Sequence, residues 1–354
     1  MNKFKIALLF SIFALVSFSS LSCSNFFVNS LSSKKIAELK SGEGPGEVLI
    51  VRDEYTLNEL TFKVEVVDNK ILIADNSLKR FQVLDSDGKP ELIIGVKTTQ
   101  QFNEYKNFNF GVIGAFTMDS SKNLYVQNRL ETRLNSSSAE GSNFSPSYIL
   151  VFDANGDLQY TMGKLGTPEF PFFYIEKLFV DEDDRLHVIS RSFNSWELYR
   201  FNKKKRERFI DFSKFEFKEK DDNNTYNGII ENLLLFRNGN EIIISVAFYH
   251  DVRFKYRKLY IYSLEKEKFI REIGSFPDPK NVPFGISDDK IVYFWNIEGK
   301  DIKFMLTSLD GDIINNVRLK LDPKIIFSKI IPDNEGDLYS YQVSGNTLQI
   351  FKWN

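Results

Sequence analysis

The sequence predicts an all-β fold, a six-bladed β-propeller with four-stranded blades whose last blade is closed by an N-terminal strand. Three observations predict it: a strand pattern that repeats six times, an unpaired strand at each end of the repeats, and many aromatic residues. The 354-residue chain contains 34 Phe, 15 Tyr and 42% hydrophobic residues. Aromatic side chains favour half-buried pleated sheets, and one large β domain can have this length.

The repeated unit consists of a short apolar strand, an acidic or Asn-containing turn, and a second strand that begins with an aliphatic residue. The second strands are expected to begin 47 to 62 residues apart, at Ile71, Leu124, Leu186, Ile242, Ile291 and Leu338. Third strands follow, beginning at Phe81, Tyr148, Leu198, Leu259, Lys303 and Leu348. Turns such as Asp85–Gly88 then lead to fourth strands, because Gly accepts positive φ at little cost. A unit of four strands with this period is typical of propeller blades.

The sixth unit has no fourth strand before the sequence ends at Asn354. The segment Lys35–Leu39, near the other end, has no unit of its own. We expect this segment to pair beside Leu348–Lys352, because the closure would remove two sheet edges with unpaired backbone groups.

The first 22 residues have the pattern of a secretory signal peptide. Lys3 and Lys5 precede an apolar stretch at residues 6–16, which is short for a membrane span. The segment Ser20–Cys23 resembles the lipobox of bacterial lipoproteins, with Ser20 in the place where Leu is usual. The resemblance implies cleavage before Cys23 and lipidation of its sulfur; ordinary signal peptidase cleavage after Ser22 would cut the same bond.

Cys23 is the only cysteine in the chain, and a reactive thiol at the end of a secreted protein would be unusual. This favours lipidation, and two or more acyl chains would anchor the protein stably in a membrane. The expected organisation is a signal peptide at 1–22, a lipidated Cys23 with a tether at 23–34, and a propeller at 35–354. The expected location is the bacterial cell envelope, at the outer membrane or the cell surface.

Gly42–Glu47 has the sequence GEGPGE and resembles an element between the blades of bacterial six-bladed β-propeller proteins related to NHL-repeat propellers. A weaker similarity occurs at residues 163–170. The segment Ile73–Asn76, followed by Arg80–Asp85, also resembles the NHL core pattern. The resemblance implies the fold and an envelope location. It implies no single activity, because propellers have many functions.

No arrangement of residues predicts catalysis, a metal site or a cofactor. Asp85–Gly88 and Asp333–Asp337 lack the ligand spacing of a calcium loop and are expected to be hairpin turns. His187 is expected in the core, and His250 beside Asp251 is weak evidence for a general base. The basic run Lys203–Arg208 has no interleaved aromatic residues and predicts a solvated hairpin, so we expect no nucleic-acid partner.

One face of the propeller is predicted to bind a partner, because Arg, Trp and Tyr are frequent at interface hot spots and can stack on sugars. This face carries the loops between second and third strands. Its candidate residues are Arg129, Arg133, Arg191, Trp196, Tyr249, His250, Arg253, Tyr256 and Trp295. For Trp196 and Trp295, burial in the blade core is the alternative.

The leading hypothesis is a non-enzymatic binding or scaffolding lipoprotein that contacts a protein or glycan. The alternatives are an envelope enzyme, a hydrolase or lyase with a glycan or peptide in the central channel, and a factor that assembles other envelope proteins. An enzyme would need acids or His on the inner strands. Inner strands such as Leu233–Phe236 and Phe179–Val180 are apolar, which favours the binding protein.

Overall fold

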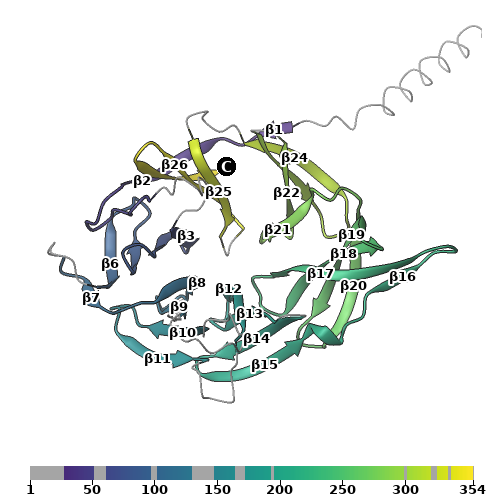
Figure 1. Ribbon diagram of the computed structural model, residues 1–354, viewed down its shortest axis with the longest axis horizontal. Helices are drawn as coiled ribbons and strands as arrows, with labels where there is room; N and C mark the ends of the chain where they lie inside the picture. Colours follow the sequence, from purple (N-terminus) through teal and green to yellow (C-terminus); the bar gives the residue numbers. More distant parts are fainter. Residues whose placement is uncertain are drawn as a thin grey trace, which may run out of the picture.

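The computed structural model describes residues 28–51, 61–96, 102–129, 147–163, 172–192, 195–298, 301–319, 325–333 and 336–353. It confirms the expected fold, with six sheets arranged as blades around a central axis (Figure 1). Within these residues, no helix is long and apolar enough to cross a membrane.

Each blade contains four strands in the expected order. The inner strands are β3 (Phe62–Val67), β8 (Val112–Met118), β12 (Tyr174–Val180), β17 (Thr225–Leu235), β21 (Val282–Ile286) and β25 (Ile325–Pro332). The second strands are β4 (Lys70–Asp75), β9 (Leu124–Arg129), β13 (Leu186–Arg191), β18 (Glu241–His250), β22 (Val292–Glu298) and β26 (Leu338–Ser344). The expected second strands are therefore confirmed within one residue of their predicted starts.

The third and outer strands complete the blades. The third strands are β5 (Arg80–Leu84), β10 (Ser147–Phe152), β14 (Trp196–Asn202), β19 (Arg253–Ser263), β23 (Asp301–Thr307) and β27 (Thr347–Trp353). The outer strands are β6 (Pro90–Gly95), β11 (Leu158–Met162), β15 (Lys205–Asp211), β20 (Lys268–Phe276), β24 (Ile313–Leu319) and β2 (Ser33–Lys40). A short 3-10 helix, Phe212–Lys214, follows β15.

Three blades have a fifth strand that the repeat pattern did not predict. β7 (Tyr105–Asn107) pairs in parallel with β6, and β16 (Lys218–Lys220) pairs with β17. β1 (Val28–Ser30) pairs in parallel with β24 of blade five. Part of the segment expected to be a tether is therefore joined to the propeller before residue 35, because its backbone completes the edge of a neighbouring blade.

The acidic residues that begin the hairpin turns stabilise these turns directly. The carboxylate of Asp85 accepts hydrogen bonds from the backbone N–H of Asp87 at 2.9 Å and of Lys89 at 2.8 Å. Asp333 accepts from the N–H of Asp337 at 2.8 Å. Gly88 has a φ of 81°, which a residue with a Cβ rarely adopts. The hairpin interpretation of both acidic segments is thus confirmed.

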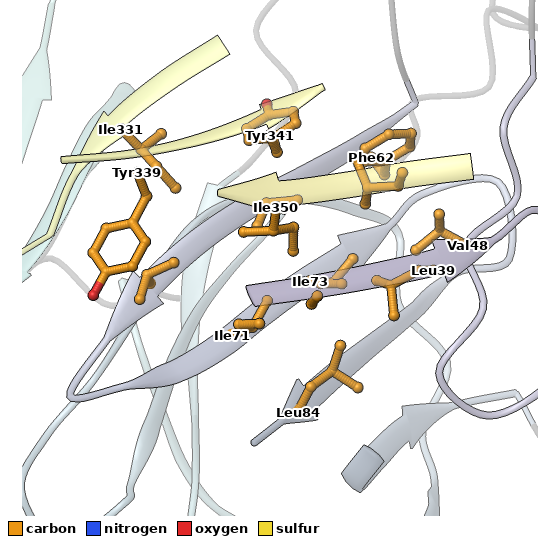
Figure 2. Packing of buried hydrophobic residues seen from close by; sticks show 14 of the residues in the cluster. Leu39, Val48, Phe62, Ile71, Ile73, Leu84, Ile331, Tyr339, Tyr341 and Ile350 are labelled. Carbon is orange, nitrogen blue, oxygen red and sulfur yellow. The ribbon is translucent and has the colours of Figure 1, made fainter. Parts of the chain in front are cut away.

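The predicted closure of the last blade is confirmed. β2 pairs with β27, with Leu39 opposite Leu348 and Lys35 opposite Phe351. Figure 2 shows Leu39 and Ile350 packed with residues of blade one such as Ile71 and Ile73. The N-terminal strand therefore closes the ring and also buries apolar side chains between blades six and one.

The GEGPGE segment lies against the third strand of blade one. Arg80 donates from Nη1 to the carbonyl of Glu43 and from Nη2 to that of Glu47, both at 2.6 Å. Gln82 donates from Nε2 to the carbonyl of Glu47 at 2.7 Å and accepts from the N–H of Gly46 at 3.1 Å. The two sequence elements of the resemblance are therefore in contact, and the side chains of β5 hold the backbone that leads into blade one.

Candidate functional site

The predicted binding face is the end of the propeller where second strands turn into third strands. Cys23 and Arg133 lie outside the described residues. Four of the other candidates lie at the ends of second strands: Arg129, Arg191, Tyr249 and His250. Three lie in the first residues of third strands: Trp196, Arg253 and Tyr256. Trp295 lies within β22. Tyr249 and His250 were expected in a loop, but β18 and β19 extend until only Asp251 and Val252 form the turn. The expectation was wrong because backbone pairing continues beyond the apolar core.

Arg191 and Trp196 line a pocket of about 380 Å³ between blades three and four. The guanidinium of Arg191 lies 5.4 Å from the centre of the Trp196 ring. The other apolar walls come from the connection after β15 and from β17; they are Phe212, Phe215, Phe217, Ile229 and Ile230. A cation above an indole beside other rings is an arrangement that suits stacking and anionic ligand groups.

The polar rim of this pocket is ordered by hydrogen bonds. Ser195 donates from Oγ to the carboxylate of Asp211 at 3.0 Å, and the N–H of Ser213 donates to the same oxygen at 2.9 Å. Burial alone would raise the pKa of Asp211, but the hydrogen bonds from Ser213 and Ser195 outweigh it and lower this pKa. Asp211 is therefore ionised at neutral pH and holds the two rim serines in place.

Trp196 combines the two roles that the sequence left open. Its exposed fraction is 7%, and its indole Nε1 donates to the carbonyl of Ile230 at 2.9 Å. The side chain thus belongs to the blade core, while one part of it lines the pocket. The hydrogen bond fixes the ring between blades three and four.

The candidates at the tip of blade four lie on opposite faces of its sheet. Tyr256 stacks on Phe248 at 5.2 Å, and its hydroxyl donates to Glu219 of β16 at 2.8 Å. Tyr249 is on the other face, with its ring 5.9 Å from that of Phe254. Phe248 and Tyr249 are neighbours in β18, so their side chains lie on opposite faces of the sheet. Tyr256 is on the face of Phe248, so Tyr249 and Tyr256 do not form one site.

His250 does not form a catalytic pair with Asp251. The distance between its Nε2 and the Asp251 carboxylate is 3.8 Å, and its Nδ1 lies 3.4 Å from the carbonyl of Thr225. A general base needs a closer and oriented partner. His187 is fully buried, with Nε2 2.8 Å from the carboxylate of Asp181, which confirms its expected place in the core.

The central channel contains a cavity of about 360 Å³ with charged side chains that the sequence analysis missed. They come from the inner strands of blades one, three and six and are Lys63, Glu65, Glu176, Lys177 and Lys329. The expectation of apolar inner strands was therefore wrong at these positions. In β3, the charged residues Lys63 and Glu65 alternate with buried apolar residues, and this alternation was the available signal.

Burial in the channel perturbs the pKa values of these groups. Lys177 is open to the water of the cavity but has protein atoms on all sides of it. This partial loss of solvation lowers its pKa. Burial also raises the pKa of Glu65, although Lys329 and Lys177 act in the opposite direction. The pKa of Lys63 is lowered by burial and then by repulsion from Lys329 and Arg129. Arg129, a residue of the predicted face, therefore acts electrostatically on the channel.

Trp295 lies at the channel rather than on the outer rim. It lines the same cavity as the charged residues, as do Trp196 and Phe284. Its ring centre is 4.9 Å from that of Phe284 and 5.5 Å from that of Phe304. The structure thus separates the predicted residues into a pocket between blades three and four, the tip of blade four, and the channel.

No family model matches this chain, and no curated protein matches it in sequence. Among solved structures, it is similar to the gluconolactonase XC5397 of Xanthomonas campestris, with 9% identity, a TM-score of 0.46, and coverage of 92% of this chain and 100% of the other. A luciferin-regenerating enzyme and the Dos1 propeller are similar too, each with 10% identity, a TM-score of 0.44 and coverage of 92% and 95%. We draw no functional conclusion from similarities this distant.

Proposed function

We propose that this protein is a non-enzymatic binding protein of the bacterial cell envelope, anchored in a membrane through lipidated Cys23, that contacts a protein or glycan through one face of its propeller. The observation that carries the proposal is the pocket between blades three and four on that face. An aromatic wall with a few fixed polar groups at the rim is typical of ligand sites.

The chemistry of this pocket favours a ligand with an apolar or sugar ring and an acidic group. Trp196 and the neighbouring phenylalanines offer ring faces, and Arg191 offers a cation at the edge. Ser192 and Ser195 add hydroxyl oxygens that can accept hydrogen bonds, since their protons are donated to the carbonyl of Ser195 and to Asp211. Ile229, whose exposed fraction is 60%, adds apolar surface next to the opening.

The path of the chain near the anchor supports the choice of face. β1 runs parallel to β24, so the chain enters β1 from the end of β24 that begins at Ile313, next to the hairpin turn of blade five. Cys23 lies five residues before Val28, a reach of about 18 Å when extended. An anchor at this hairpin end leaves the opposite face open to a partner.

Exposed apolar residues near the anchor agree with this orientation. Ile313 and Ile314 of β24 have exposed fractions of 56% and 53%. Exposed apolar side chains beside an acyl anchor can insert into the lipid surface. The hairpin end of blade five is therefore the side that we place toward the membrane.

The anchor is tested by growing cells with a labelled fatty acid. We expect the label on the wild-type protein and not on Cys23→Ala, which should be released from the membrane. Equal labelling of the two proteins would refute the anchor.

The binding face is tested by cross-linking in native membranes, followed by purification of the protein with its partner. Arg191→Ala, Tyr249→Ala and Arg253→Ala should each weaken capture, by about 1 kcal/mol or more when measured with the isolated partner. Lys203→Ala, in the hairpin between β14 and β15, is the matched control and should bind normally. If the Lys203 variant loses the partner and the other three keep it, the wrong face has been chosen.

A further inference from the structure

The charged side chains of the channel are held apart rather than paired. Within the described part of the chain, Lys63, Glu65, Glu176, Lys177 and Lys329 form no ion pair within 4.0 Å of one another. Elsewhere in the molecule, partly buried charges are paired directly, as Arg257 is with Glu231 at 2.6 Å. Glu176, Lys177 and Lys329 are exposed to the water of the cavity, and Lys63 and Glu65 are half-buried. These side chains can therefore exchange their water for the groups of a polar ligand, and their separation around one cavity indicates a place for it.

The composition of the cavity defines the chemistry of this ligand. Lys63, Lys177 and Lys329 bring ammonium groups from three different blades, which can bind a carboxylate from several sides. Glu65 and Glu176 bring acceptors for hydroxyl groups. The lysines outnumber the glutamates, so the charge of the site favours an anion.

The apolar part of the cavity adds a second constraint. Trp295 and Phe284 lie in contact on one side, with ring centres 4.9 Å apart, and both line the cavity together with Trp196. Ring faces of this kind pack against the C–H surface of a sugar. A small aliphatic anion would leave these faces without a partner.

We propose that the channel binds an acidic sugar residue, with its carboxylate among the lysines, its hydroxyl groups toward Glu65 and Glu176, and its ring against Trp295 and Phe284. The volume of about 360 Å³ is within the range of small-molecule sites. The shifted pKa values of Glu65, Lys177 and Lys63 agree with this assignment, because groups with perturbed pKa values are frequent at functional sites. The inference depends neither on the lipid anchor nor on the pocket of blades three and four.

The test uses the full chain and titration calorimetry with D-glucuronate, with D-glucose as the matched neutral probe. We expect saturable binding of glucuronate at millimolar concentrations or below, and at least tenfold weaker binding of glucose. Lys177→Met and Lys329→Met should each weaken glucuronate binding about tenfold, which corresponds to ~1.4 kcal/mol. Lys203 lies in the hairpin between β14 and β15 and does not line the channel. Lys203→Met should therefore bind glucuronate as the wild type does.

A second measurement keeps the test independent of variant folding. An amine-reactive reagent followed by mass spectrometry reports the labelling rate of each lysine, and glucuronate should slow labelling of Lys177 and Lys329 but not of Lys203. Absence of saturable glucuronate binding, equal binding of glucose, or unchanged labelling of both channel lysines would each overturn the proposal.

Discussion

The junction between blades six and one and the outer part of blade four both consist of antiparallel strands, but different interactions stabilise them. At the junction, β2 buries Ala37 and Leu39, and fully buried side chains of β5 hold the preceding connection. The outer part of blade four consists of β16 and the ends of the strands around it. Its side chains interact through aromatic rings and ion pairs that are partly exposed to water, such as Lys258 with Glu219. The first region closes the fold, and the second adds surface to a fold that is already closed.

Each region nevertheless contains one arginine with an exposed fraction of 1%, Arg80 in β5 and Arg257 in β19. Arg80 binds the backbone that precedes its blade, through the carbonyls of Glu43 and Glu47. Arg257 binds the backbone that follows its blade, through the carbonyl of Asn281, and pairs with Glu231. A recognisable sequence element surrounds only the first, so the same physical solution can occur without a shared motif.

The largest effect is expected from removing the closing strand. Deletion of residues 33–41 should lower the free energy of unfolding by at least about 4 kcal/mol, because it removes buried side chains and exposes the edge of β27. Urea denaturation followed by circular dichroism measures the change.

The outer part of blade four provides the matched control for this deletion. Lys218 pairs with Asn227, so residues 219–226 can be replaced by Asn-Gly, which favours a tight hairpin. The shortened protein should lose less than about 2 kcal/mol. Comparable losses in the two variants would contradict the distinction between a closing strand and an added one.

A smaller difference is expected between the two buried arginines. Arg80→Met should cost about 3 kcal/mol of stability, because it leaves two backbone carbonyls without charged donors. Arg257→Met should cost about 2 kcal/mol, since the Glu231 side chain is 26% exposed and can gain water. Arg253→Met, an exposed position of the same strand as Arg257, is the control. A greater loss for Arg257→Met than for Arg80→Met would reverse the proposed order.

The smallest effect concerns pH and Glu219 at the tip of blade four. Burial opposes ionisation of Glu219, but hydrogen bonds from Lys258 and Tyr256 outweigh it, and its pKa lies below the ordinary value of 4.5. A lowered folded-state pKa stabilises the protein above pH 4.5, and this contribution is lost as the pH falls through the folded value. The protection of β16 amides against exchange, relative to the intrinsic rate at each pH, should therefore decrease below pH 4.5, and Glu219→Gln should weaken this dependence. An equal response of the variant would exclude Glu219 as the cause.

The sequence determined the strand order, because the order follows from patterns that are local to the chain. Aliphatic starts, Asp-containing turns and the period of the repeats depend on neighbouring residues. The pairing of Lys35–Leu39 beside Leu348–Lys352 was predictable because each segment belongs to an incomplete blade that the other completes. The register of this pair was not predicted.

The added strands escaped prediction because they depend on a distant partner. β1 is three residues long and is ordered by β24, almost three hundred positions later. Nothing within Val28–Ser30 identifies that partner. The separation of Tyr249 and Tyr256 on opposite faces of their sheet was not predicted either. It depends on how β18 and β19 pair, with a register shift between Phe248 and Tyr249.

The sequence by itself thus determined the architecture, that is, six blades of four strands and a closing N-terminal strand. Only the tertiary structure decided which residues meet in a site. Lys63, Lys177 and Lys329 belong to the inner strands of blades one, three and six, which lie far apart in the sequence. Their convergence results from ring closure, which brings the inner strands of six separate blades around one axis.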